Sequence, residues 1–272
     1  MCRLFGSRSV HPRPVRDALV EADNALVEQS VRHPDGWGLA HYGDGGPKLI
    51  RRGRAAYDDP EFVGLSAEIA SQTVVAHIRK ATAGEVCARN AHPFRHGPWV
   101  FAHNGEIPGF ERFRRALLAR LPRPYLRFVQ GDTDSEVCFY LFLAELARGG
   151  PLERGVMAEE VRSGLRAVER HIEEVTSEQV DTRALLLNFL VTNGEVMVAT
   201  SRGKDLFWRT EGRDRLRRFF VSSEPIGQLS EPGLNALGEW FEVAPGGAVG
   251  VDRGLRLWAQ APRVEAPLPV VA

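Results

Sequence analysis

The order of the sequence patterns constrains the fold most: strand-like segments come first, two long helical segments follow, and strand-like segments return. TVVAHIR (73–79) and PWVFAHN (98–104) predict strands, whereas residues 135–148 are apolar on nearly every side and predict a buried helix. Residues 154–176 predict a second, amphipathic helix, with apolar side chains three or four positions apart. Because strands and helices do not alternate, we expect an α+β fold with two mostly antiparallel sheets and helices outside.

Further segments fit the same plan. The apolar spacing over residues 13–31 predicts a helix that ends at HPDGWG, and GLAHY with PKLIRR predicts a hairpin across Gly43–Gly46. Strands are predicted again at ALLLNFLVT, EVMVATS, DLFWRT, RFFVSSE and WFEVAP, with a solvated loop at EGRDRLRR (211–218). No linker divides the chain, so we expect one domain over residues 2–260 and a Pro-rich tail at 261–272.

Composition excludes several classes of function. The 272 residues carry a formal net charge of zero, so no basic field favours nucleic acid or a membrane surface. No apolar stretch approaches the roughly 20 residues of a membrane span, and the N-terminus lacks the apolar core of a signal peptide. The three cysteines form no close pair, which indicates free thiols in the reducing cytoplasm rather than disulfides.

Cys2 directly follows the initiator methionine. After removal of Met1, this residue would carry both a thiol, with a pKa near ~8.5, and an α-amine that titrates near ~7.7–8.0. The amine could then act as the base for the thiol, as in enzymes with N-terminal threonine. The position alone leaves the alternative open, since some residue must follow Met1.

Amide chemistry at Cys2 would need further groups. The Asn104 side chain and the Gly105 N–H, predicted at a turn after a strand, could stabilise an oxyanion, although Asn-Gly is also a common hairpin signal. Arg79 ends a strand and could bind a carboxylate, or it could simply be exposed. Asp134 begins the apolar helix and could bind an ammonium group, cap the helix, or do both.

The motifs occur in a specific order: Cys2, DGWG (35–38), AHIRKAT (76–82), NAHPF (90–94), AHNGEI (102–107) and GDTDSE (131–136). This ordered set resembles the class II glutamine amidotransferases, which are N-terminal-nucleophile hydrolases with a four-layer αββα sandwich. The resemblance is greatest to the stand-alone bacterial group that includes the γ-glutamyl hydrolase of ergothioneine synthesis. It covers at least residues 2–140 and, more weakly, SSEPI (222–226) and the segment from Trp240 to Pro245.

The resemblance implies a role for each matching residue. Cys2 would be the nucleophile, with Asn104 and Gly105 as the oxyanion hole. Arg79, with Thr82 nearby, would hold the α-carboxylate of a glutamyl group. Asp134 and the Gly105 carbonyl would bind its α-ammonium.

Other motif residues receive weaker expectations. Gly36 and Gly38 in DGWG would allow close approach to the nucleophile, and Trp37 would be a wall of the site. His92 lies in the family pattern without a role that we can derive.

The resemblance also implies how the reaction ends. Glutamine or a γ-glutamyl conjugate would give a thioester that water hydrolyses to glutamate, without a metal or organic cofactor. Lys80 stands where synthase-fused members carry tryptophan, and Ala83-Gly84 replaces their histidine-glycine. Since the chain ends at residue 272, we expect no fused synthase, so released ammonia would need a separate partner or would leave. The oligomeric state stays open.

Three alternatives compete with this interpretation. A metal enzyme would use the clustered histidines, which are His77, His92, His96 and His103, but Pro93 disfavours a helical pair and no CxxC or HExxH motif occurs. A cysteine protease would use Cys87 or Cys138, of which Cys138 is predicted to be an inert core thiol. A non-catalytic subunit would keep the glutamyl pocket without turnover.

Overall fold

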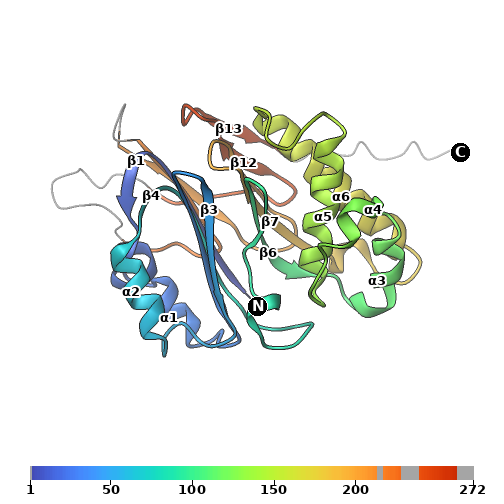
Figure 1. Ribbon diagram of the computed structural model, residues 1–272, viewed down its shortest axis with the longest axis horizontal. Helices are drawn as coiled ribbons and strands as arrows, with labels where there is room; N and C mark the ends of the chain where they lie inside the picture. The colour runs from blue at the N-terminus through green and yellow to red at the C-terminus, as the bar shows by residue number, and fades with distance from the viewer. Residues whose placement is uncertain (1, 213–216, 228–238, 262–272) are drawn as a thin grey trace, which may run out of the picture.

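A computed structural model describes residues 2–212, 217–227 and 239–261. It consists of four layers, with two facing β-sheets in the middle and helices on both outer faces (Figure 1). All strand pairs described are antiparallel. The predicted α+β fold is confirmed, with the αββα order that the resemblance implies.

The first sheet has seven strands in the order β11-β9-β10-β1-β4-β2-β3. Their bounds are β1 Arg3–Pro14, β2 Trp37–Gly43, β3 Gly46–Arg52, β4 Ala70–Ile78, β9 Phe207–Glu211, β10 Arg218–Ser222 and β11 Phe241–Glu242. Helices α1 (Leu26–Ser30) and α2 (Pro60–Glu68) lie on its outer face.

The second sheet has six strands in the order β13-β12-β8-β7-β6-β5. Their bounds are β5 Phe94–His96, β6 Trp99–Glu106, β7 Leu186–Thr192, β8 Met197–Thr200, β12 Ala248–Val251 and β13 Leu257–Gln260. On its outer side lie α3 (Phe110–Leu118), α4 (Arg123–Leu126), α5 (Asp134–Ala147) and α6 (Ala158–Thr176).

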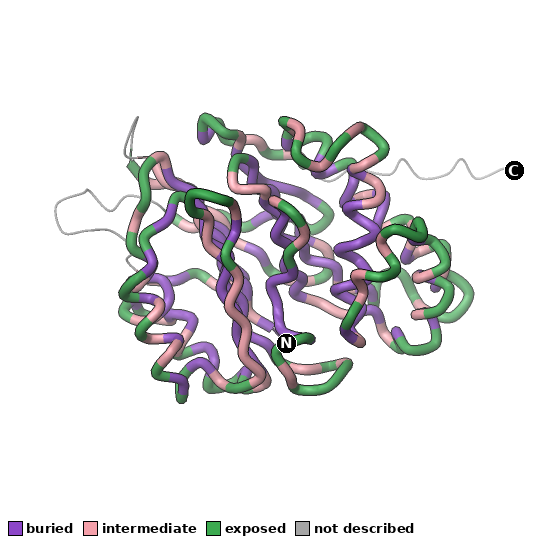
Figure 2. The backbone as a smooth tube through the Cα atoms, viewed as in Figure 1, coloured by how far each residue is buried: buried purple, intermediate pink, exposed green. Residues whose placement is uncertain are grey.

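Strand alternation divides the buried residues into three apolar layers. Phe5 and Ile78 face α1 and α2. Leu4 and Val75 point to the opposite side of the same sheet, because side chains alternate along a strand, and they belong to the layer between the sheets. Phe101 of β6 faces α5 and α6. Figure 2 shows buried backbone running through both sheets and along α5, which agrees with the predicted all-round burial of this helix.

The predicted helix over residues 13–31 is wrong as one element. β1 continues through Pro14, a single π-helical turn covers Asp17–Glu21, and α1 begins only at Leu26. Asn24 has a left-handed φ of 59° that a continuous helix cannot accommodate. The predicted apolar face was nevertheless right: Val15, Ala18, Leu19, Ala22 and Leu26 all lie in the core under α1 and α2.

Most other predicted elements are confirmed with shifted ends. The hairpin β2–β3 turns at Gly43–Gly46, and α5 and α6 lie within one to four residues of their predicted starts. WFEVAP forms only the two-residue strand β11, while β1 was not predicted as a strand. Residues 213–216 of the predicted Arg-rich loop and residues 262–272 of the predicted tail lie outside the described residues. In the part of the chain that is described, no helix has the length and apolar character needed to cross a bilayer.

Candidate active site

Three strands carry polar residues to one end of the layer between the sheets. Cys2 directly precedes β1, His77 lies near the end of β4, and Asn104 lies near the end of β6. Each lies two positions along its strand from an apolar residue of that layer: Cys2 from Leu4, His77 from Val75, and Asn104 from Ala102. Because side chains alternate along a strand, all three project between the sheets at this end.

Cys2 is buried, and its sulfur is held by the backbone that follows β4. The Lys80 N–H donates to Sγ at 3.3 Å, and the thiol donates to the Lys80 carbonyl at 3.4 Å. Burial raises the pKa of the Cys2 thiol, while the Lys80 hydrogen bond and the Arg79 cation act in the opposite direction. The thiol is therefore protonated at neutral pH and would need a base to act as a nucleophile.

A small cavity brings the predicted site residues together. Cys2, Arg79, Thr82, Gly105 and Asp134 all line it, and its volume is about 20 Å³. That is room for about one water molecule. Sequence reasoning missed other lining residues, among them Lys80, His103 and Ser135.

Asn104 and Gly105 lie within β6 and not at a turn, so that part of the prediction is wrong. They pair with Asn188 and Leu187 of β7. Asn104 is not one of the residues lining the cavity, but its buried Oδ1 has no hydrogen-bond partner among the described residues. A Cβ at Gly105 would lie 1.8 Å from the Leu186 carbonyl oxygen, so only glycine fits there.

Arg79 is buried, which excludes the alternative of an exposed strand-end arginine. Its guanidinium donates to the carbonyls of Glu85 (2.8 Å) and Ala83 (2.7 Å), so it holds the loop after β4 in place. Burial lowers the pKa of Arg79, and the neighbouring thiols and carboxylates oppose this shift. Thr82 lies on the same loop and lines the cavity.

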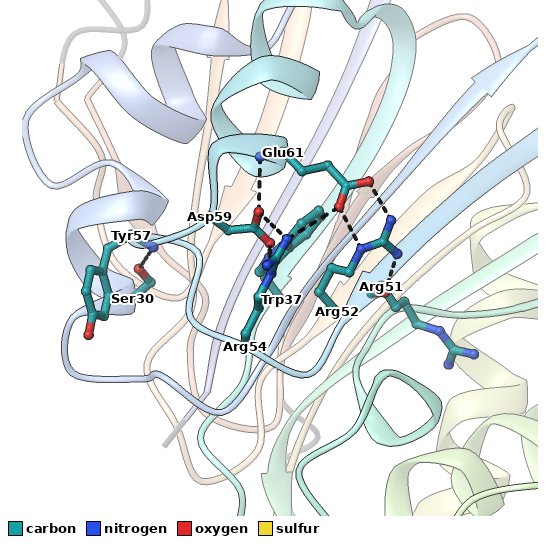
Figure 3. Close-up of polar contacts among 8 residues, drawn as sticks. All are labelled: Ser30, Trp37, Arg51, Arg52, Arg54, Tyr57, Asp59 and Glu61. Atoms are coloured by element: carbon teal, nitrogen blue, oxygen red, sulfur yellow. Dashed lines mark hydrogen bonds and ion pairs between the residues drawn. The ribbon is translucent and has the colours of Figure 1, made fainter.

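The DGWG motif supports this loop from the other side. The Arg79 N–H donates to the Gly36 carbonyl at 2.7 Å, and a Cβ at Gly38 would lie 2.1 Å from the His92 carbonyl oxygen. The prediction that Trp37 is a wall of the cavity is wrong, because Trp37 points to the opposite face of the sheet. There its Nε1–H donates to Asp59, which also accepts from Arg54 (Figure 3).

Asp134 is the first residue of α5, and the helix cap is Thr133, whose Oγ1 accepts from the Glu136 N–H. The alternative that Asp134 caps the helix is therefore wrong. Its Oδ2 accepts from the Ile107 N–H at 2.8 Å, and its Oδ1 accepts from the Ser135 hydroxyl at 3.0 Å. The carboxylate is thereby aimed between β6 and the loop after β4.

His92 and His103 line the cavity, and His77 packs against His92. The rings of His77 and His92 lie 4.2 Å apart, and His77 Nε2–H donates to the His103 carbonyl. Burial lowers the pKa of His77 to about 3 and that of His92 well below its usual value, so both are neutral at pH 7. His96 packs apart from them, against Phe128. No group of three or more possible metal ligands occurs among the described residues.

The other two cysteines lie outside the cavity. Cys138 is on α5 in the core, where burial raises the pKa of its thiol well above the usual value. Cys87 is half-buried, with its backbone against Gly53. Cys2 is thus the one cysteine, among the described residues, that shares a cavity with a guanidinium and a carboxylate.

Comparisons with known proteins identify the family of this chain. The family model described as "Glutamine amidotransferases class-II" matches residues 1–211. The chain is 26% identical to "Probable glutamine amidotransferase DUG3" of Saccharomyces cerevisiae, over 89% of this chain and 79% of that protein. It is 25% identical to "Gamma-glutamyl-hercynylcysteine sulfoxide hydrolase" of Mycolicibacterium smegmatis, over 72% and 77% respectively.

A solved structure shares the fold. The glutamine aminotransferase class-II domain protein from Silicibacter pomeroyi superposes with a TM-score of 0.68 at 23% identity. The match covers 96% of this chain and all of that one.

Proposed function

This chain belongs to the class II glutamine amidotransferases, and from that premise we propose that it hydrolyses the γ-amide of glutamine or of a γ-glutamyl conjugate. The main support is the single cavity lined by Cys2, Arg79, Gly105 and Asp134. These supply a nucleophile, a cation for the α-carboxylate and an anion for the α-ammonium. The relative from Mycolicibacterium smegmatis, whose name specifies a γ-glutamyl substrate, supports the same substrate class.

Substrate binding requires an exchange of partners at Arg79. In the described structure its guanidinium donates to carbonyls of the loop after β4, and the cavity is too small for a glutamyl group. The α-carboxylate replaces these carbonyls, because a carboxylate forms a stronger charge-assisted pair with arginine. The loop that carries Thr82 then shifts outward and widens the cavity.

The chemical step starts from Cys2 as the first residue of the mature chain. The sulfur attacks the γ-carbonyl while the thiol proton passes to the α-amine, which removes the need for a buried thiolate. The resulting oxyanion receives hydrogen bonds from Asn104 and the Gly105 N–H.

The intermediate then breaks down in two stages. The Cys2 α-ammonium returns the proton to the nitrogen of the γ-amide, which leaves as ammonia or an amine. The γ-glutamyl group stays on sulfur as a thioester. Water hydrolyses this thioester to glutamate and restores the thiol. No cofactor enters these steps. We also propose that residues 2–260 form a single domain.

Glutamate release tests the proposal. We expect wild-type protein to release glutamate from at least one member of a panel of glutamine, simple γ-glutamyl amides and γ-glutamyl thioether conjugates. Cys2→Ala is expected to lower this rate by at least about 10³-fold, because the nucleophile is lost. Intact mass should show that the active protein lacks Met1.

Labelling supplies the matched control. A glutamine-analogue electrophile should modify Cys2, and Cys87→Ser should leave both labelling and turnover unchanged. Labelling at Cys87 would instead favour the protease alternative. A protein that binds glutamate but turns over no member of the panel would favour the non-catalytic subunit.

A further inference from the structure

A line of hydrogen bonds leads from β7 to the Asp134 carboxylate. His103 of β6 donates from Nε2 to the Leu186 carbonyl at 2.9 Å, and its Nδ1 lies 2.9 Å from the Ser135 Oγ. The Ser135 hydroxyl lies 3.0 Å from Asp134 Oδ1. The remaining oxygen, Oδ2, accepts from the Ile107 N–H. All three side chains in this line are buried.

The first member of this line is closely packed. The His103 imidazole lies 5.0 Å from the Phe189 ring, between centroids, and its Nε2 lies 2.7 Å from where a Gly105 Cβ would stand. Both β6 and β7 are interior strands of the second sheet, so the imidazole is fixed by the sheet itself. Through the hydrogen bonds of His103 and Ser135, the second sheet therefore fixes the orientation of the Asp134 carboxylate on α5.

Proton counting gives the line a second property. The Leu186 carbonyl can only accept, so His103 Nε2 carries hydrogen, and Nδ1 of a neutral ring is then an acceptor. The Ser135 hydroxyl has one hydrogen and two acceptors, Nδ1 and the Asp134 carboxylate. The hydroxyl donates this hydrogen to Asp134 Oδ1, and this bond holds the carboxylate in place while a cation donates to its remaining lone pairs.

We propose that Ser135 and His103 are positioning residues that orient Asp134 toward the α-ammonium of the glutamyl group. This inference rests on the proposed function, since it concerns how the same cavity recognises its substrate. Neither residue touches the reacting atoms, and both act through Asp134.

Two ligands separate positioning from a general structural role. Glutamate is the product whatever the leaving group, and glutarate is the same molecule without the α-ammonium. We expect wild-type protein to bind glutamate more tightly than glutarate in calorimetry. Ser135→Ala should weaken glutamate binding by about tenfold, the size typical of a hydrogen bond to a charged group, and leave glutarate binding unchanged.

The controls use variants that keep or remove a hydroxyl elsewhere. Ser135→Thr retains the hydroxyl and should restore the preference for glutamate. Ser66→Ala removes a buried serine hydroxyl from α2, on the opposite face of the molecule, and should leave both affinities unchanged. Should Ser135→Ala fail to fold, His103→Asn provides the same comparison of the two ligands.

Two results would overturn the inference and are distinguishable. If Ser135→Ala weakens both ligands equally, or changes neither, Ser135 does not act on recognition of the ammonium. If wild-type protein binds neither ligand, the proposed function itself fails and the inference fails with it.

Discussion

The layer between the two sheets has two regions that differ in chemistry but share the same strands. Its middle is apolar, with Leu4, Val75 and Ala102 packed against Leu190 and Val100. Its end, one alternation further along those strands, carries the thiol of Cys2, the imidazole of His77 and the amide of Asn104. The apolar middle fixes the strands, and the fixed strands then aim the polar groups.

The two regions also differ in how well their polar atoms are paired. Tyr42, on the other border of the apolar middle, donates its hydroxyl hydrogen toward the carbonyls of Pro98 and Thr192. At the polar end, Asn104 Oδ1 and His77 Nδ1 are buried without a hydrogen-bond partner among the described residues. A buried polar atom without a partner costs about 1–3 kcal/mol. Such a cost is typical of a site where binding, and not stability, has determined the residues.

The comparison predicts its largest effect at Asn104. Asn104→Ala should lower kcat for glutamate release by about 10²–10³-fold, because one donor to the oxyanion is lost. Since no side-chain hydrogen bond of Asn104 holds β6 within the described part of the chain, the melting temperature should change little. Steady-state kinetics together with thermal unfolding measure both quantities. Normal turnover in Asn104→Ala would remove this residue from the proposed oxyanion hole.

Gly6 provides the converse test in the apolar middle, where we expect a substitution to lower stability and to leave the site unchanged. A Cβ there would lie 2.8 Å from Leu190 Cδ2 and 3.2 Å from Met197 Sδ, at a close approach of the two sheets. Gly6→Val should therefore lower the free energy of unfolding by about 1–3 kcal/mol, as overpacking does. The folded protein should keep its KM for the best substrate of the panel. Urea denaturation measures the first effect, and a large rise in KM would show that the two regions are not separable.

The sequence predicted which residues share a cavity, Asn104 excepted, better than it predicted the local structure around them. Cys2, Arg79, Gly105 and Asp134 were proposed from the order of the motifs, and they do meet in one cavity. The residues between motifs gave only periodicity, and periodicity cannot distinguish one helix from two short turns that bury the same face. The single predicted helix over residues 13–31 failed for that reason.

Other errors came from contacts between distant segments. Asn-Gly is a strong turn signal, yet Asn104 and Gly105 continue β6 because β7 pairs with them across the sheet. The role inferred for Ser135 depends on His103, 32 residues away along the chain, and no local pattern predicts that hydrogen bond. The one available signal was adjacency, since His103 precedes Asn104 and Ser135 follows Asp134.

The smallest predicted effect concerns how acid acts on the two regions. The described residues of the apolar middle include no histidine or carboxylate, whereas burial lowers the pKa of His77 to about 3 and also lowers the pKa of His92. The unfolded chain binds these protons near pH 6.5 and the folded chain does not. Stability from such a histidine is therefore complete above about pH 6.5 and is lost as the pH falls toward 3.

His77→Gln isolates this contribution, because glutamine does not titrate and can still donate to the His103 carbonyl. Below pH 6.5 the free energy of unfolding of wild-type protein should fall more steeply than that of His77→Gln, by up to about 1.4 kcal/mol per pH unit. Urea denaturation at pH 7, 6, 5 and 4 measures the difference, in which the carboxylates common to both proteins cancel. Parallel pH profiles would mean that protons reach His77 in the folded state, and that the polar end is open to water where the apolar middle is not.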